Sequence, residues 1–160
     1  MNKIEQDIID KGVSLEHMPA PWLKVLREQM MEHARQGRTS RALEYARGML
    51  LASPEDSESW LRLAMLYREL GQLGMSARCL AQAEAKEPTH RGVRLEQGEI
   101  WVAMGEPGRG LEMIRDVFLE GYDSSKKLDD QDMLTLRAGA ILECVQRVVD
   151  EMARAPIKDS

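Results

Sequence analysis

The chain has 160 residues, and its 27 acidic against 22 basic residues give a formal net charge of −5. That length suits a single domain with a core of its own, while the acidic balance argues against a nucleic-acid-binding surface, which gathers Lys and Arg on one face. No apolar run reaches membrane-spanning length and residues 1–11 are too polar for the apolar part of a signal peptide, so we expect a cytoplasmic protein that does not insert into membranes.

A short helix is predicted near the N-terminus, at residues 3–11. Ile4 and Ile8 share one face of this helix, opposite Asp and Glu side chains. Pro19 and Pro21 then interrupt helical structure, because proline lacks the amide donor and restricts the residue before it. The segment is therefore expected to be a separate capping element at the start of the fold.

Three repeats of 34 residues follow, which we place at residues 23–56, 57–90 and 91–124. The period shows in three columns, namely a turn glycine, a small residue where two helices should cross, and a proline. The members are Gly37, Gly71 and Gly105; Ala42, Ser76 and Gly110; and Pro54 and Pro88. Each repeat is expected to form a pair of helices, so the predicted fold class is all-α.

The second repeat shows this pattern most clearly. Trp60, Leu63, Ala64 and Tyr67 recur at three and four residues and form one apolar stripe along its first helix. Gly71 follows, where a helix commonly ends on a residue with positive φ. These residues resemble the tetratricopeptide consensus, which implies a superhelix of helical hairpins whose first helices line an inner groove.

A last helix is predicted at residues 130–154. Apolar residues recur at three and four along it, and the acidic cluster at 129–132 suits the positive end of a helix dipole. A stack of hairpins leaves its final apolar face open, so this helix is expected to cap the array. Residues 1–160 are thus predicted to form one tetratricopeptide domain with a capping helix at each end.

Residue types that carry catalysis or metal binding do not come together in the sequence. His17, His33 and His90 lie in three separate elements, and Cys79 and Cys144 have no second cysteine at metal-binding spacing. Phosphate-binding glycine motifs and nucleophile motifs do not occur either. We therefore predict that the protein is not an enzyme and that it binds no cofactor and no metal.

The tetratricopeptide register assigns three columns of residues to the inner groove. They are Arg27, Leu61 and Leu95; Met31, Met65 and Glu99; and Ala34, Arg68 and Val102. Such a surface favours an extended or helical peptide with apolar anchors, with Arg27, Arg68 and Glu99 setting its orientation. It does not suit an acidic tail, since Glu99 would repel a carboxylate. In an alternative interpretation, a terminal helix covers some of the apolar positions.

The whole layout resembles the class II chaperones of bacterial type III secretion, which guard hydrophobic translocator proteins before export. The resemblance rests on the chain length, the acidic charge, the flanked repeats, the turn at 12–15 and the junction at 104–108. It implies a chaperone that holds an apolar segment of a secreted client in the groove, and a homodimer formed through Ile4 and Ile8. The alternative function is a scaffold or regulatory adaptor that joins partner proteins in an assembly.

Overall fold

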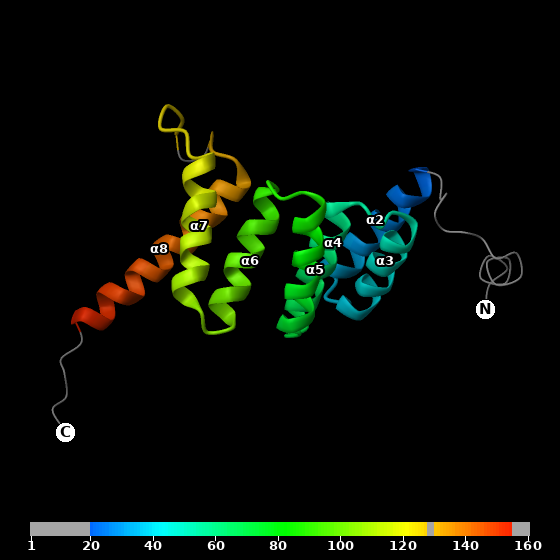
Figure 1. Ribbon diagram of the computed structural model, residues 1–160, viewed down its shortest axis with the longest axis horizontal. Helices are drawn as coiled ribbons and strands as arrows, with labels where there is room; N and C mark the ends of the chain where they lie inside the picture. The colour runs from blue at the N-terminus through cyan, green and yellow to red at the C-terminus, as the bar shows by residue number, and fades with distance from the viewer. Residues whose placement is uncertain (1–19, 128–129, 155–160) are drawn as a thin grey trace, which may run out of the picture. The chain divides into compact units, whose positions relative to one another are not determined.

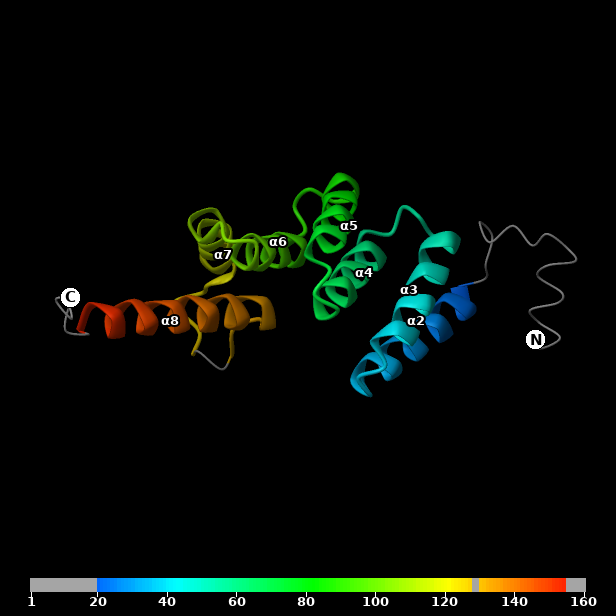
Figure 2. The same ribbon diagram turned by 90° about the horizontal axis from the view of Figure 1, so that it is seen from below.

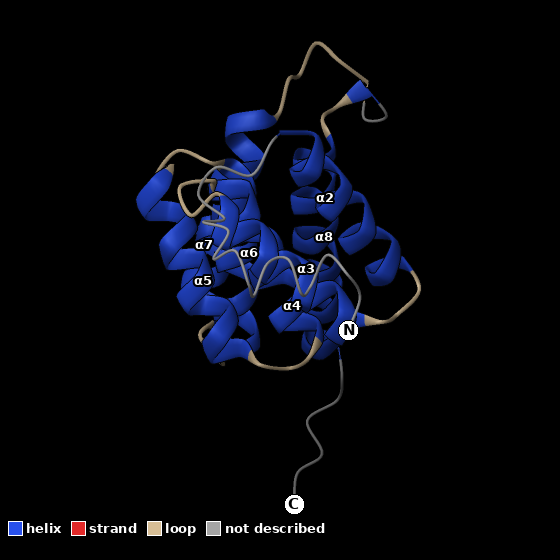
Figure 3. Ribbon diagram, turned by 90° about the vertical axis from the view of Figure 1, so that its right-hand side faces the viewer, coloured by secondary structure: helices blue, strands red, loops and turns tan. Residues whose placement is uncertain are grey.

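The structure of the protein, a computed structural model, describes residues 20–127 and 130–154. Seven α-helices make up this part of the chain, and no strand occurs in it (Figure 3). The predicted all-α class is therefore confirmed. The predicted N-terminal helix at residues 3–11, with Ile4 and Ile8, lies outside the described residues, so the dimer through that helix stays a prediction.

The chain forms two compact units, and the boundary between them lies between Lys86 and Glu87. The first unit contains two helical hairpins, and α3 of the first hairpin also packs against α4 of the second. Its helices are α2 (Ala20–Arg35), α3 (Thr39–Ala52), α4 (Ser57–Glu69) and α5 (Leu73–Lys86). Figure 1 shows the members of each hairpin side by side. Helix α4 starts at Ser57, and the first helix of the second unit starts at Arg91. The prediction of a single domain stays a prediction.

The second unit is one hairpin closed by a long helix. Its helices are α6 (Arg91–Ala103), α7 (Pro107–Gly121) and α8 (Met133–Arg154). Helix α8 packs mainly on α7 and also touches α6, and its C-terminal half extends past α7 (Figure 2). The fully buried core cluster joins all three helices through Leu95, Ile114, Val117 and Ala138. Helix α8 therefore caps the third repeat, beginning at Met133 where the sequence predicts residue 130.

The turn inside each hairpin repeats the same backbone hydrogen bonds. After α4, the Gly71 N–H donates to the Arg68 carbonyl and the Gln72 N–H to the Tyr67 carbonyl, both at 2.9 Å. Equivalent bonds follow α2 and α6. The glycine in this turn has a φ of 71°, a conformation that costs other residues energy. Each first helix therefore ends in a Schellman-type turn, which explains the glycine column of the sequence.

In the second and third repeats, the two helices of the hairpin are in close contact at the small-residue column. In the second repeat, Ser76 is fully buried and its Oγ donates to the Ala64 carbonyl at 2.8 Å. In the third repeat the equivalent positions are Gly98 and Gly110, and a Cβ at Gly110 would lie 2.6 Å from Val102 Cγ2. Side chains at this column are small because the backbones leave no room for larger ones.

A polar cluster fixes the start of α8. Asp132 Oδ1 accepts the N–H groups of Leu134 and Thr135, both at 3.0 Å, as an N-cap does. Its Oδ2 accepts from Thr135 Oγ1 at 2.7 Å and from Arg91 Nη1 at 3.1 Å. Arg91 Nη2 also donates to the Val117 carbonyl at 3.0 Å. These bonds tie the first turn of α8 to the start of α6 and the end of α7.

We expect the second unit to lose stability in acid through Asp132. The hydrogen bonds from Thr135, with a smaller contribution from Arg91, lower the pKa of Asp132 from 3.8 to about 2. Because the folded-state pKa is depressed, this contribution is complete above 3.8 and is lost as the pH falls toward 2. Urea denaturation followed by circular dichroism should show a steeper acid loss for the wild type than for Asp132→Asn, and equal slopes would contradict this.

Candidate peptide-binding surface

A hollow of about 200 Å³ opens between α2 and α4, the first helices of the two hairpins in the first unit. Each helix contributes four residues to its lining. They are Met30, Met31, Ala34 and Arg35 of α2, and Arg62, Met65, Leu66 and Glu69 of α4. We call this feature the α2–α4 hollow. It lies on the helix face that the repeat register assigns to the inner groove.

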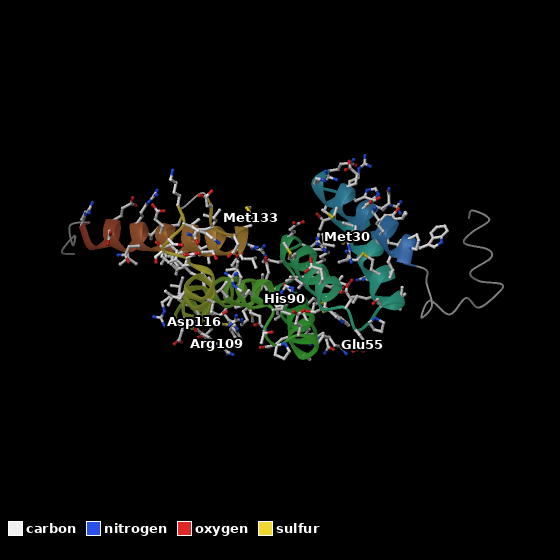
Figure 4. The ribbon with its side chains drawn as sticks, turned by 90° about the horizontal axis from the view of Figure 1, so that it is seen from above. Met30, Glu55, His90, Arg109, Asp116 and Met133 are labelled. Atoms are coloured by element: carbon white, nitrogen blue, oxygen red, sulfur yellow. The ribbon has the colours of Figure 1, made fainter. Side chains whose placement is uncertain are left out.

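The floor of the α2–α4 hollow is apolar. Met30 and Leu66 are only 3% and 5% exposed, whereas Met31 is 41% exposed and Met65 is half-buried. Figure 4 shows Met30 on α2 within the first unit. An apolar side chain that entered this hollow would leave water for a surface of thioether and aliphatic carbon. That transfer is the dominant favourable term in most protein association.

The rim of the hollow carries charged side chains, and each arginine of the rim is paired with a neighbouring carboxylate. Arg35 Nη2 lies 3.0 Å from a carboxylate oxygen of Glu32, and Arg62 Nη2 lies 2.6 Å from one of Glu58. Glu69 accepts a hydrogen bond from the Thr39 hydroxyl at 3.5 Å. Because both arginines already face a carboxylate, the rim offers little net positive charge to an acidic peptide tail. The hollow is better suited to an uncharged, apolar side chain.

The predicted groove residues of the first unit differ in how deeply they are buried. Met31 and Met65 lie together in the hollow, as neighbours from successive repeats. Arg27 is exposed on α2 and Arg68 is half-buried on α4, and neither lines the hollow. Leu61 is 7% exposed, because α4 is packed between α3 and α5. The expectation that Leu61 lines an open groove as an apolar contact is therefore corrected.

The predicted groove residues of the second unit lie under α8. Leu95 is fully buried in the core cluster with Ala138 of α8, and Val102 packs against the same cluster. Glu99 pairs with Arg137 of α8, whose Nη2 lies 2.6 Å from its carboxylate. The expectation that these three side chains line an open groove is corrected, since α8 covers this face of α6. The alternative of a covering terminal helix holds for this repeat.

Several lining residues were not predicted from the sequence. Met30 is buried and forms part of the floor of the hollow, although it belongs to none of the three groove columns. Arg62, Leu66 and Glu69 fall outside the three groove columns. A simpler signal was available, because residues 62, 65, 66 and 69 recur at three and four and so share one face of α4.

His90, His33 and Cys79 have surroundings that indicate structural roles. His90 Nδ1 accepts the Val93 N–H at 3.2 Å as the N-cap of α6, and His33 stacks on Tyr45. Burial raises the pKa of the Cys79 thiol to about 11, so the thiol stays protonated at neutral pH and is a poor nucleophile.

Within residues 20–127 and 130–154, no three His, Cys, Asp or Glu side chains are grouped for a metal ion. None of the helices described there has the length and apolar character to cross a membrane.

Solved structures share the arrangement of these helices. SycD, the type III secretion translocator chaperone of Yersinia enterocolitica, superposes with a TM-score of 0.68 at 15% identity, over 81% of this chain and 94% of that chain. PcrH in complex with the chaperone binding region of PopD gives a TM-score of 0.67 at 14% identity, over 82% and 96%. The chain has the tetratricopeptide-repeat fold. Among proteins of this fold it resembles the class II translocator chaperones.

Tetratricopeptide proteins with other ligands are also similar. The first repeat domain of Spaghetti (RPAP3), bound to the HSP90 peptide SRMEEVD, gives a TM-score of 0.64 at 14% identity, over 84% of this chain and 98% of that chain. No family model and no curated protein sequence matches the chain. Likeness at this level of identity establishes the fold, and a fold serves many functions, so function must be argued from the site itself.

Proposed function

We propose that the protein is a cytoplasmic chaperone that holds an apolar segment of a secreted, translocator-type client and keeps it soluble before type III secretion. The observation that carries this proposal is the convergence of Met31 and Met65, from successive repeats, on one apolar hollow. The likeness to SycD and to PcrH with its bound PopD region supports the same type of client.

The α2–α4 hollow suits one large aliphatic side chain of such a segment. Full burial of a side chain of this kind contributes about 1.5–3 kcal/mol. Methionine side chains are flexible and polarizable, so Met31 and Met65 can adjust to anchors of different shape. Because one anchor supports only weak binding, we place further contacts of the client beside the hollow, with Arg27 and Arg68 orienting it.

Charging the hollow should remove client binding. We expect the double variant Met31→Glu plus Met65→Glu to bind a fluorescein-labelled peptide of the PopD chaperone binding region about 100-fold more weakly than the wild type. Two carboxylates would lose their hydration against an apolar anchor, at a cost of about 3 kcal/mol. Fluorescence anisotropy measures the affinity, and circular dichroism checks that helicity is retained.

A matched control separates the hollow from surface charge in general. Met75 on α5 is 40% exposed, close to the 41% of Met31, and it does not line the hollow. Met75→Glu should therefore leave the affinity unchanged. Unchanged binding by a folded Met31→Glu, Met65→Glu protein would rule out the hollow as the client site.

Client chemistry distinguishes the chaperone from the alternative adaptor. Co-expression with full-length PopD should bring PopD into the soluble fraction. The wild-type chain should not bind the acidic peptide SRMEEVD, because both rim arginines already face carboxylates. PopD that stays insoluble, together with stable binding of the chain to already folded proteins, would favour a scaffold that joins partners in an assembly.

A further inference from the structure

Three of the eleven methionines of the chain meet at the α2–α4 hollow. Met31 of α2 is 41% exposed and Met65 of α4 is half-buried, so both residues are partly open to solvent. Met30, at 3% exposure, lies behind them. A methionine sulfur is the one group in this lining that a mild oxidant converts from apolar to polar.

We propose that the hollow is an oxidation-sensitive modification site, at which hydroperoxides convert Met31 and Met65 to methionine sulfoxide and thereby release an apolar client. The client part rests on the proposed function. A lone pair of the thioether sulfur attacks one peroxide oxygen, the O–O bond breaks, and an S–O bond forms. Sulfur is oxidised by two electrons, and hydrogen peroxide is reduced to water after a proton moves to the departing hydroxide.

The lining explains why oxidation would act on binding here. A sulfoxide oxygen is a strong hydrogen-bond acceptor, and an apolar anchor seated in the hollow would remove its water. The neighbouring Ala34 and Leu66 side chains cannot donate to it. Arg35 and Arg62 have N–H donors besides the Nη2 groups that face Glu32 and Glu58, but a guanidinium turned toward the sulfoxide would place a charged group against the apolar anchor. Each sulfoxide should therefore lower client affinity about tenfold.

Other methionines provide an internal comparison. Met75, Met104 and Met133 are 40%, 49% and 78% exposed, so they should also react with peroxide. None of the three lines the hollow, and Met133 lies in the second unit at the start of α8 (Figure 4). Their oxidation should leave the hollow apolar. Met49, at 2% exposure, should resist the reagent altogether.

The test uses the full chain and the labelled PopD peptide. Wild type, Met31→Leu plus Met65→Leu, and the control Met75→Leu plus Met104→Leu plus Met133→Leu are treated with hydrogen peroxide, and peptide mass spectrometry assigns each sulfoxide. We expect wild type and control to lose affinity tenfold or more and to regain it with methionine sulfoxide reductases. The Met31→Leu plus Met65→Leu protein should keep its affinity throughout.

Two results would overturn the inference. One is a wild type that carries both hollow sulfoxides yet binds as before, and the other is an equal loss in the Met31→Leu plus Met65→Leu protein. A client-independent arm measures fluorescence of the apolar dye ANS, which should fall on oxidation in wild type more than in that variant. If the wild-type protein does not bind the peptide before oxidation, the proposed function fails. The ANS measurement still shows in that case whether oxidation makes the hollow polar.

Discussion

Replacing Gly110 with alanine should destabilise the second unit by about 3 kcal/mol, at the upper end of what overpacking costs. The new Cβ would lie 2.6 Å from Val102 Cγ2 and 2.9 Å from the Val102 backbone nitrogen, and it would also meet the Gly98 carbonyl oxygen. Two of these three atoms belong to the backbone of α6 and cannot rotate away. Relief therefore requires α6 and α7 to move apart, which opens the packing around Ile114.

A second glycine in the same helix supplies the control for this prediction. A Cβ at Gly108 meets no atom within 4 Å, so Gly108→Ala should be neutral or slightly stabilising, by up to about 1 kcal/mol, through the lower entropy of its unfolded chain. Urea denaturation monitored by circular dichroism measures both variants. Similar midpoints for Gly110→Ala and Gly108→Ala would show that the helices do not cross as tightly as the structure has them.

The small-residue column, where the two helices of a hairpin cross, shows how much of this fold the sequence predicts. Ala42, Ser76 and Gly110 recur with the repeat period, and that recurrence alone places a close helix approach in every hairpin. The turn glycines do the same for helix ends, because positive φ is a local requirement that a single residue type meets most easily. Features of this kind depend on neighbours within one repeat, so the period is sufficient to find them.

Burial of the groove columns could not be predicted in the same way. The repeat register places Leu61 and Leu95 in one column, but their exposure depends on which helices pack around them. Helix α8 covers Leu95 because it follows the last hairpin directly, and no repeat column encodes Arg137. The start of α8 was similarly ambiguous, since several acidic residues precede it and only Asp132 makes the N-cap hydrogen bonds to Leu134 and Thr135.

Removing the charge of Arg137 should destabilise the second unit by about 2–3 kcal/mol, less than the loss of a fully buried pair, because its side chain is 35% exposed and solvent screens the charge. Arg137 Nη2 lies 2.6 Å from carboxylate oxygens of both Glu96 and Glu99, and the side chain of Glu96 is only 3% exposed. Burial alone would lower the pKa of Arg137, yet the two glutamates raise it above its ordinary value. Arg137→Met keeps much of the side-chain volume but removes the cation from α8, and removing one partner of a largely buried ion pair destabilises a protein.

The source of that loss can be separated from ordinary surface electrostatics. Arg147→Met, also on α8, removes an exposed pair with Glu143 and should leave the stability nearly unchanged. Adding Glu96→Gln and Glu99→Gln to Arg137→Met should recover part of the stability, because the two carboxylates that faced Arg137 are then replaced by uncharged amides. If the triple variant is as unstable as Arg137→Met, the packing of the arginine stem holds α8 over Leu95, and the ion pairs contribute little to that contact.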